Sequence, residues 1–338
     1  MNAIIKPRID LENRTKLETV IPLATPFVIF VDPSDRCNLR CRFCPTGDHK
    51  LMKITSGRNF GGMSLELFKK IIDDITRFEQ PIKVLRLYKE GEPLLNPKFT
   101  EMVRYARESG CAERIDTTTN AVLLSARITD ELAEINGLDR MNISIYGMNP
   151  AQYMDFSQAK VNFERLVENI RYFYEHRGNC EVIVKINGDV ISENDRRKFL
   201  ETFGDIADGV FIEHIMSCWP EFDLEQHGVT ANNEFGIYGQ PIREVRVCPY
   251  IFYSFSINSD GTASACFLDW ERKLLIGDAK THSVKEIWNG IQLLAHQQMM
   301  LRNERKQHPV CGKCGQMTHG LPDDIDAHAL ELLVKITT

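Results

Sequence analysis

The 338-residue sequence lacks the features that would place it in a membrane or on a nucleic acid. No stretch of 18 apolar residues occurs, so no transmembrane helix is predicted. Residues 1–25 mix charged and apolar side chains and contain no apolar core of a signal peptide. No block of basic residues stands out and the net charge is −6, which argues against nucleic acid as a partner. No internal repeat or low-complexity segment is visible.

The chain does contain ten cysteines and an apolar fraction of 43%, which allows a sizeable core. Its length leaves room for one large domain, or for a barrel with a small second domain. Because no signal peptide is visible, the cysteines predict metal binding or redox chemistry in a reducing cytoplasm, and not structural disulfides.

Strand-like and helix-like segments alternate as far as about residue 215. The predicted strands are Phe27–Val31, Ile82–Tyr88, Arg114–Thr118, Arg140–Ile145, Glu181–Ile186 and Val210–His214. The predicted helices between them are Ser64–Phe78, Pro97–Ser109, Ser125–Ile135, Val161–His176 and Glu193–Phe203. This order of β/α units predicts a parallel sheet, either open or closed into a barrel. Beyond residue 240, short β-like pieces, turns and cysteines replace the alternation, so a domain boundary is expected within residues 220–245.

Polar side chains recur at one parity near the carboxyl ends of the predicted strands. They are Arg86 and Tyr88, Asp116 and Thr118, and Asn142 and Ser144. The interior of a packed barrel is dominated by branched apolar side chains, so this pattern predicts a lumen that holds a polar ligand. The alternative is that this parity faces the helices or the solvent.

Cys37, Cys41 and Cys44 form a C-x3-C-x2-C triplet directly after the first predicted strand. Three thiolates this close on a loop can share one [4Fe–4S] cluster and leave one iron without a protein ligand. An open iron can bind a small molecule and pass an electron to it. The alternative is a zinc knuckle or a redox-sensing cysteine group.

With the aromatic Phe43 before its last cysteine, the triplet resembles that of the radical S-adenosylmethionine (SAM) enzymes. In that family the open iron chelates SAM, whose reductive cleavage releases a 5′-deoxyadenosyl radical. The resemblance implies an α/β fold with a partial (β/α)6 TIM barrel. It also implies an external one-electron reductant such as flavodoxin or ferredoxin.

The resemblance extends to the segments that follow the predicted strands. Glu90-Gly-Glu-Pro93 resembles the family's Gly-Gly-Glu-Pro segment, which holds the SAM ammonium, and Glu90 at the first position is a possible extra acceptor for SAM or substrate. Thr119 and Asn120 resemble the family's Thr-Asn-Gly turn. The implied SAM-binding residues are Phe43, Glu90, Gly91, Glu92, Thr119, Asn120, Ser144, Lys185 and Asn187. The alternative for the strand-end residues is an ordinary polar group without a ligand.

Cys248, Cys266 and the Cys311-x2-Cys314 pair resemble the C-terminal auxiliary-cluster module of SPASM and twitch proteins. A full SPASM module continues with further cysteines, whereas none follows Cys314. Four thiolates ligate one [4Fe–4S] cluster completely, so the expected cofactors are two [4Fe–4S] clusters and SAM. A structural zinc site is the alternative for these four cysteines.

Four parts of the chain are expected from this organisation. They are an N-terminal extension (1–25), a radical SAM partial barrel (26–225), a small auxiliary iron–sulfur domain (240–322) and a C-terminal tail (323–338).

Candidates for the chemistry on the substrate follow the last predicted strand, on the face where barrel active sites form. Cys218 could donate a hydrogen atom to a substrate radical and give a redox-neutral epimerisation; alternatively, it packs beside Trp219. Oxidation of an alcohol needs a base for the hydroxyl proton, and Glu213, His214 and Glu221 are the candidates. Strand alternation puts Glu213 and His214 on opposite faces, so one of the two is expected in the lumen.

The main functional hypothesis is oxidation of a carbohydrate, aminocyclitol or nucleotide-sugar alcohol, with the auxiliary cluster accepting an electron. This hypothesis follows the resemblance to carbohydrate enzymes of the 2-deoxy-scyllo-inosamine dehydrogenase type. The alternatives are a sugar epimerase that uses Cys218, a maturase that modifies a peptide or protein, and a non-enzymatic electron-transfer protein. Peptide maturases often carry an N-terminal leader-binding domain, and the roughly 25 residues before the first predicted strand favour a small carbohydrate substrate.

Anaerobic reconstitution of the chain should load about eight irons, with a broad absorbance near 400 nm, because two [4Fe–4S] clusters are expected. Replacing Cys37, Cys41 and Cys44 by alanine should leave about four irons and abolish SAM cleavage, because the four auxiliary cysteines remain. Zinc in place of iron, or a chain without metal, would contradict the cluster assignment.

Overall fold

The computed structural model describes residues 2–320 and 323–337, so the expected boundary at residue 322 and both chain ends lie outside the described residues. These residues form a ten-stranded sheet in the order β1-β7-β6-β5-β4-β3-β2-β8-β9-β10. The strands are β1 Ile4–Ile5, β2 Val28–Val31, β3 Ile82–Arg86, β4 Ala112–Thr119, β5 Arg140–Ile145, β6 Glu181–Asn187, β7 Gly209–Glu213, β8 Ser254–Ile257, β9 Thr262–Ser264 and β10 Leu275–Asp278. Strands β2 to β7 are parallel neighbours, which confirms the partial (β/α)6 barrel.

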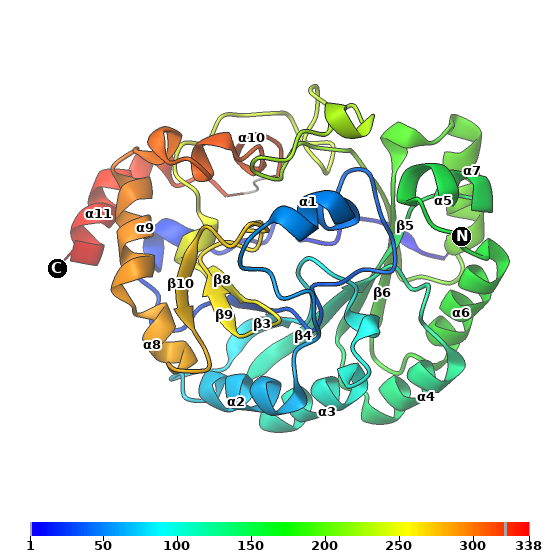
Figure 1. The fold of residues 1–338 in the computed structure, drawn as a ribbon, viewed down its shortest axis with the longest axis horizontal. Helices are drawn as coiled ribbons and strands as arrows, with labels where there is room; N and C mark the ends of the chain where they lie inside the picture. The colour runs from blue at the N-terminus through cyan, green and yellow to red at the C-terminus, as the bar shows by residue number, and fades with distance from the viewer. Residues whose placement is uncertain (1, 321–322, 338) are drawn as a thin grey trace.

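Helices cover the outer face of this curved sheet (Figure 1). The helices are α1 His49–Ile54, α2 Leu65–Ile75, α3 Phe99–Ser109, α4 Ala126–Ile135, α5 Pro150–Ser157, α6 Phe163–His176, α7 Glu193–Phe203, α8 Val284–Trp288, α9 Ile291–Leu301, α10 Gln316–His319 and α11 Ala329–Thr337. In Figure 1, α2, α3, α4 and α6 follow one another along the outside, and α1 lies across the open centre. No helix of the described residues is both apolar enough and long enough to span a membrane.

The sequence predictions of strands and helices hold for the barrel. All six predicted strands and all five predicted helices are present, with ends shifted by a few residues. Ser64 and Ser125 cap α2 and α4, because each side chain accepts a hydrogen bond from a backbone amide of the first turn. The short helices α1 and α5 were not predicted.

Two helices, α8 and α9, follow one another in the auxiliary region. Helix α8 begins with a capping box, in which Ser283 and Glu286 bond to each other's backbone amides. It ends at Trp288, and Gly290 serves as the N-cap of α9. An Asn-Gly pair favours a helix end.

The auxiliary region continues the barrel sheet. Strand β8 pairs in parallel with β2, with Phe255 opposite Ile29, and β9 and β10 follow as antiparallel strands. Phe255 is fully buried, and its ring centroid lies 5.8 Å from that of Trp288. The barrel and the auxiliary region therefore share one hydrophobic core.

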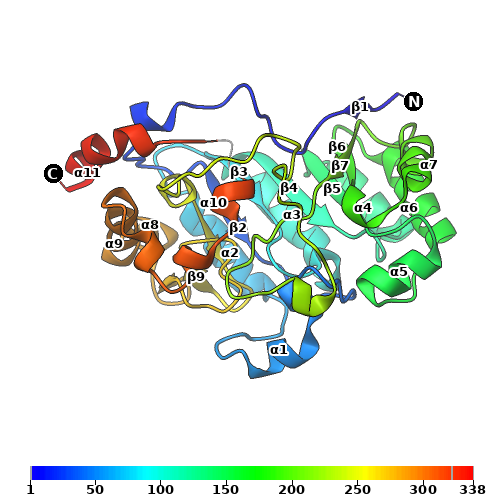
Figure 2. The same ribbon diagram turned by 90° about the horizontal axis from the view of Figure 1, so that it is seen from above.

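The N-terminal segment also belongs to the barrel. Strand β1 pairs in parallel with β7. Beyond β1, Arg140 Nη1 donates a hydrogen bond to the Arg8 carbonyl at 2.7 Å, and Arg14 forms an ion pair with Asp323. Figure 2 shows this segment, in dark blue, crossing the molecule from the β1 edge toward α11. It brings the side chain of Arg8 into the lumen.

Phe255→Ala should lower the free energy of unfolding by about 3–5 kcal/mol, because it leaves a cavity where the barrel and the auxiliary region join. Leu275 in β10 is 43% exposed, and Leu275→Ala serves as the control with an expected change within about 0.5 kcal/mol. Urea unfolding of both variants under anaerobic conditions checks the difference. If both variants have the same urea midpoint of unfolding, Phe255 of β8 does not stabilise the shared core.

Candidate functional site

The cysteine triplet lies in the loop after β2, at the carboxyl ends of the parallel strands. The loop closes through a hydrogen bond from the Cys44 amide to the Cys41 carbonyl at 3.1 Å. Burial raises the pKa of the Cys37 thiol to about 12, with smaller contributions from Glu92 and Cys44. Burial also raises the pKa of Cys41, and Cys37 and Cys44 raise it further. The three thiols are therefore close neighbours, and a bound metal cation would favour their thiolate forms.

The loop after β3 packs directly on the cysteine loop. A Cβ atom at Gly91 would lie 1.9 Å from the Ser34 carbonyl oxygen and 2.5 Å from that of Arg36. The Glu92 amide donates to the Arg36 carbonyl at 2.8 Å. Residue 91 must therefore be glycine for the two loops to meet, and this contact fixes Glu92 beside the cysteines.

The Glu92 carboxylate is fully buried and no basic side chain of the described residues pairs with it. Its oxygens accept hydrogen bonds from Thr119 Oγ1 at 2.6 Å and from the Asn120 amide at 2.8 Å. Burial raises the pKa of Glu92 to about 7 despite these hydrogen bonds. Asn120 Nδ2 in turn lies 3.9 Å from Cys37 Sγ. A buried carboxylate without a cation, next to the cysteine loop, suits the amino group of SAM.

Aromatic side chains pack together beside the cysteine triplet. The ring of Phe43 lies 5.3 Å from that of Phe156, nearly parallel to it, and 5.8 Å from that of Tyr146. Ser144 forms a hydrogen bond with Tyr146, which places the end of β5 against the same rings. Phe43 and Ser144 therefore face the space next to the cysteines, as expected for contacts with a nucleoside.

Glu90 has partners that leave little capacity for SAM. Its side chain is fully buried and lies 2.7 Å from Arg58, 2.9 Å from Arg272 and in contact with Lys89. Burial alone would raise the pKa of Glu90, but Lys89, Arg272 and Arg58 lower it to about 2. Glu90 thus connects the barrel to the auxiliary region through Arg272. This geometry disfavours the prediction that Glu90 accepts a hydrogen bond from SAM or substrate.

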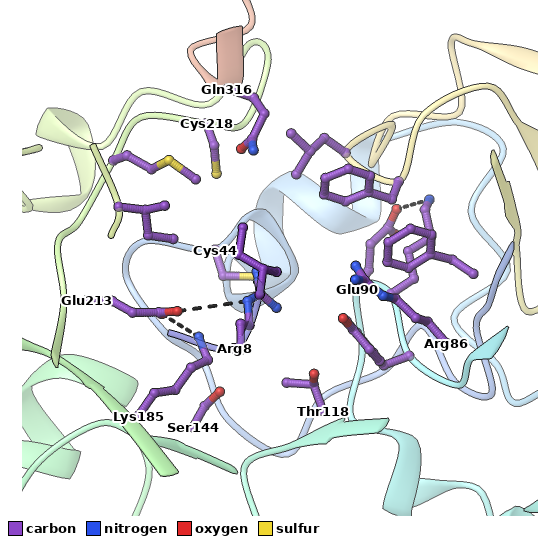
Figure 3. A pocket seen from close by; sticks show the side chains of 18 of the residues that line it. Arg8, Cys44, Arg86, Glu90, Thr118, Ser144, Lys185, Glu213, Cys218 and Gln316 are labelled. Carbon is purple, nitrogen blue, oxygen red and sulfur yellow. Dashed lines mark hydrogen bonds and ion pairs between the residues drawn. The ribbon is translucent and has the colours of Figure 1, made fainter. Parts of the chain in front are cut away.

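A cavity of about 660 Å³ extends from the triplet into the lumen (Figure 3). Of the polar side chains predicted from strand parity, Arg86, Tyr88, Thr118 and Ser144 line it, whereas Asp116 and Asn142 do not. Lys185 and Asn187 of β6 also line it, as does Glu213 of β7. The prediction of polar side chains in the lumen is therefore confirmed in part, since apolar side chains line much of the wall as well. The volume falls in the usual range for ligand sites of about 300–1,000 Å³.

Glu213 is the buried carboxylate of this wall. Its Oε2 accepts a hydrogen bond from Lys185 Nζ, and its Oε1 lies 3.9 Å from Arg8 Nε (Figure 3). Among the described residues Oε1 has no hydrogen-bond partner. Burial lowers the pKa of Lys185, and Glu213 opposes that effect. One carboxylate oxygen is thus available to accept a proton or a hydrogen bond from a ligand.

The two other base candidates lie elsewhere. His214 lines the cavity as well, because β7 ends at Glu213 and strand alternation stops there, but its Nδ1 is bound to Asp189 Oδ1 at 2.8 Å. The expectation that only one of the two residues faces the lumen was therefore wrong. Glu221 forms an ion pair with Lys313 at 2.6 Å and does not line the cavity, which disfavours it as a base.

Cys218 points into the cavity, which Cys44 also lines (Figure 3). Burial raises the pKa of its thiol, and the nearby Cys314 and Cys44 raise it further. Cys314 Sγ lies 3.7 Å from the Cys218 carbonyl. A Cβ atom at Gly315 would lie 1.8 Å from the Ser217 carbonyl oxygen, so the auxiliary cysteine pair packs directly on the segment that carries Cys218.

The four C-terminal cysteines gather at one place. They are Cys248, Cys266, Cys311 and Cys314. Burial raises the pKa of Cys248 and of Cys311 to about 12, and each is raised further by the other thiols of the group. Among the described residues, no three His, Cys, Asp or Glu side chains are grouped for a single metal ion.

Sequence reasoning missed three cavity residues. Arg8, Tyr238 and Gln316 line the lumen although they lie before, after and far beyond the barrel strands in sequence. Arg8 follows β1, Tyr238 lies in the long loop after β7, and Gln316 begins α10. No motif marks these positions, because each depends on contacts between distant segments.

Comparison with known proteins identifies the family. The radical SAM superfamily matches residues 31–205, and the SPASM iron–sulfur cluster-binding domain matches residues 248–315. The AdoMet-dependent heme synthase of Methanosarcina barkeri is 31% identical over 319 residues, which cover 82% of this chain and 84% of the relative. The chain belongs to the radical SAM superfamily. A [4Fe–4S] cluster and SAM accompany the radical SAM domain, and additional iron–sulfur binding accompanies the SPASM domain.

Other radical SAM relatives match over shorter stretches. The tungsten-containing aldehyde ferredoxin oxidoreductase cofactor-modifying protein of Pyrococcus furiosus is 27% identical over 57% of this chain, which spans 52% of that relative. The dTDP-4-amino-4,6-dideoxy-D-glucose ammonia-lyase of Streptomyces venezuelae is 27% identical over 46% of this chain and 30% of its own length. The chain thus spans about half of the first and less than a third of the second.

Solved structures share the fold. BtrN in complex with AdoMet and 2-DOIA superposes with a TM-score of 0.57 at 17% identity, over 89% of this chain and 97% of BtrN. Streptococcus suis SuiB bound to the precursor peptide SuiA gives a TM-score of 0.59 at 14% identity, over 89% of this chain and 72% of SuiB. At these identities the likeness concerns the fold alone.

Glu92→Ala should weaken SAM binding by about 1.5–3 kcal/mol, the range for a hydrogen bond to a charged group. The anaerobic, cluster-loaded chain is titrated with SAM, and iron content is measured in parallel and should not change. Glu92→Gln is the matched variant, because it keeps the size of the side chain and removes its charge. If neither variant alters SAM affinity, the assignment of the Gly-Glu-Pro segment to the SAM amino group is wrong.

Proposed function

We propose that this radical SAM enzyme oxidises an alcohol of a carbohydrate, aminocyclitol or nucleotide sugar. One observation carries the proposal, the cavity that extends from the cysteine triplet to Cys218. Glu213 lines this cavity with an oxygen that has no hydrogen-bond partner among the described residues. The Cys218 carbonyl lies 3.7 Å from Sγ of Cys314 in the auxiliary cysteine pair. A candidate base therefore lines the cavity, and the proposed electron acceptor lies directly behind the segment that carries Cys218. A wall of arginine, lysine, serine, threonine and asparagine side chains suits a ligand with many hydroxyl groups.

The cofactor assignment in this proposal follows the geometry of the two cysteine groups. Cys37, Cys41 and Cys44 hold the [4Fe–4S] cluster that binds SAM, and the four C-terminal cysteines hold one auxiliary cluster. The SAM contacts come from Phe43, Gly91, Glu92, Thr119, Asn120, Ser144, Lys185 and Asn187. When bound, SAM supplies a 5′-deoxyadenosyl radical that accepts a hydrogen atom, and the auxiliary cluster supplies an acceptor for one electron. An external one-electron reductant, such as flavodoxin or ferredoxin, is required.

Glu213 is the proposed base. The substrate loses its carbon-bound hydrogen as a hydrogen atom, its hydroxyl hydrogen as a proton and one further electron, so a carbonyl compound two hydrogens lighter remains. Glu213 Oε1 accepts the proton, because it lies in the lumen without a hydrogen-bond partner among the described residues. Lys185 and Arg8 hold the carboxylate in place from two sides.

Relatives support the substrate class to different degrees. The name of the Streptomyces venezuelae relative describes chemistry on a nucleotide sugar, which favours a substrate of that kind. The Methanosarcina barkeri relative covers more of the chain, and its name refers to heme synthesis. The carbohydrate assignment therefore draws its support from the polar lumen and the Glu213 position, more than from overall similarity.

Sugar epimerisation is the second candidate, favoured by the position of Cys218. A thiol that points into the cavity could return a hydrogen atom to the opposite face of a substrate radical. That reaction needs no base and no outlet for an electron. A peptide- or protein-modifying maturase remains the third reading; the likeness to SuiB favours its fold and carries no argument for its substrate.

Cys218→Ala separates oxidation from epimerisation. Oxidation returns no hydrogen atom to the substrate, so the variant should retain turnover and its product should be two mass units lighter than the substrate. Cys111→Ala is the matched control, because Cys111 is a buried thiol outside the cavity. Product mass is measured after reaction in D2O.

An epimerase would give the opposite results. It would place one deuterium on a carbon of the product, because the thiol hydrogen exchanges with solvent. The Cys218→Ala variant would then cleave SAM without forming inverted product. These two results together would overturn the oxidation proposal.

A further inference from the structure

The lumen carries an excess of positive charge. Eight basic residues line the cavity: Arg8, Arg14, Lys83, Arg86, Lys89, Arg114, Arg140 and Lys185. Four acidic residues line it as well: Asp10, Glu90, Glu92 and Glu213. The chain as a whole has a net charge of −6, so the excess is local. A cavity with such an excess attracts anions.

Most of these cations are neutralised by the protein itself. The ion pairs are Arg14 with Asp323, Lys89 with Glu90, Arg114 with Asp116, Arg140 with Glu181, and Lys185 with Glu213. Lys83 is exposed near the start of β3 and contacts the ring of Phe27. Of the eight basic residues, Arg8 and Arg86 remain to be considered, and both lie among the side chains that line the cavity (Figure 3).

Arg86 has no counter-charge in direct contact, and the nearby buried Asp116, which raises the pKa of Arg86, is already paired with Arg114. Its side chain forms no hydrogen bond and no ion pair with any residue that the structure describes, and its Nε is buried without a partner. The guanidinium carbon lies 5.1 Å from the centroid of the Phe30 ring, which is a weak substitute for an anion. An arginine cannot lose its proton, so the charge stays in the cavity and is costly there without an anion.

Arg8 has a neutral hydrogen-bond partner in Tyr238 but no carboxylate in direct contact. Its Nε has no hydrogen-bond partner among the described residues, and the nearest carboxylate oxygen, Oε1 of Glu213, is 3.9 Å away. That carboxylate is already paired with Lys185. Arg8 and Arg86 are close enough to repel each other electrostatically. Arg8 and Lys185 thus share one carboxylate, and the side chain of Arg8 remains 25% exposed, toward the cavity that it lines.

Arg86 lies deeper in the barrel than Thr119, one of the residues proposed for SAM. Arg86 is in register with Asp116 of β4. Thr119 lies three residues further along that strand, a distance of about 10 Å at the usual rise per residue. The carboxylate of SAM, held near the carboxyl ends of the strands, is therefore poorly placed to neutralise Arg86.

We propose that Arg8 and Arg86 bind an oxyanion of the substrate, a phosphate or a carboxylate, in the lumen. This inference rests on the proposed function in one respect, that the lumen is the substrate chamber. Guanidinium groups bind both kinds of oxyanion in a bidentate manner. Of the proposed substrates, nucleotide sugars and other sugars with an acidic group fit this site. An aminocyclitol, whose charge is an ammonium, does not.

Three matched probes test the proposal without turnover: glucose 1-phosphate, glucuronate and neutral glucose. Each is titrated calorimetrically into the anaerobic holoenzyme loaded with SAM. At least one of the two anionic sugars should bind with one-to-one stoichiometry, at least tenfold more tightly than glucose. The comparison of phosphate with carboxylate identifies the preferred anion. In Arg86→Gln and Arg8→Gln this preference should fall at least tenfold.

Lys83→Gln is the control, because it removes the same charge from the same strand at its exposed end; binding should stay within twofold. Arg86→Gln should keep its iron content and SAM affinity, and its thermal midpoint without sugar should not fall, because the variant removes an unpaired charge. The proposal would be overturned if glucose bound as tightly as the anionic sugars, or if Lys83→Gln weakened anion binding as much as Arg86→Gln does. It would also be overturned if Arg86→Gln bound SAM more weakly or unfolded at a lower temperature. If the anionic sugars bind as expected but the product is not oxidised, the proposed reaction is wrong and the proposed anion site is still supported.

Discussion

Residue 91 has no room for a side chain, because its backbone lies against the carbonyl oxygens of Ser34 and Arg36. This contact joins the loop after β3 to the cysteine loop after β2, and the rest of the site depends on it. Through it, Glu92 reaches the cysteines, and Thr119 and Asn120 are fixed to Glu92 by hydrogen bonds. The family's Gly-Glu-Pro segment therefore has a steric reason for its glycine in this chain, in addition to any contact with a ligand.

Buried charge connects this site to the auxiliary region. Glu90 stands where the family has glycine, and its carboxylate is shared by Arg58, Lys89 and Arg272. Arg272 belongs to the segment between β9 and β10, so the first loop of the SAM site is tied to the C-terminal part of the chain. Removing Glu90 would leave three buried cations without their shared carboxylate, which is strongly unfavourable. The departure from the family pattern at Glu90 is thus compensated elsewhere in this chain.

Local patterns in the sequence were sufficient for the barrel. The apolar segments and the serine caps of α2 and α4 depend on neighbouring residues, and they predicted these elements to within a few residues. The cysteine spacings are local too, and the matches to the two families confirm the cofactor classes. Parity along β3 and β5 likewise predicted the polar lumen, because side chains alternate strictly in a strand.

The remaining features depend on contacts between distant segments. Arg8 reaches the lumen because the two-residue strand β1 pairs with β7, about 200 residues later. Glu90 is neutralised by Arg272, 182 residues away. His214 lines the cavity because the strand stops at Glu213, and strand ends are the least certain feature of any sequence pattern. No local pattern contains this information.

The pairing of β8 with β2 has a consequence for how electrons move. Hydrogen bonds of one continuous sheet, together with a shared core, connect the two cysteine groups, and no flexible linker separates them. The segment with Cys218 is packed against the auxiliary cysteine pair without space for a side chain at Gly315. The path between the two groups is therefore set by rigid backbone, so electron transfer along it should proceed at the same rate in viscous and in dilute solvent.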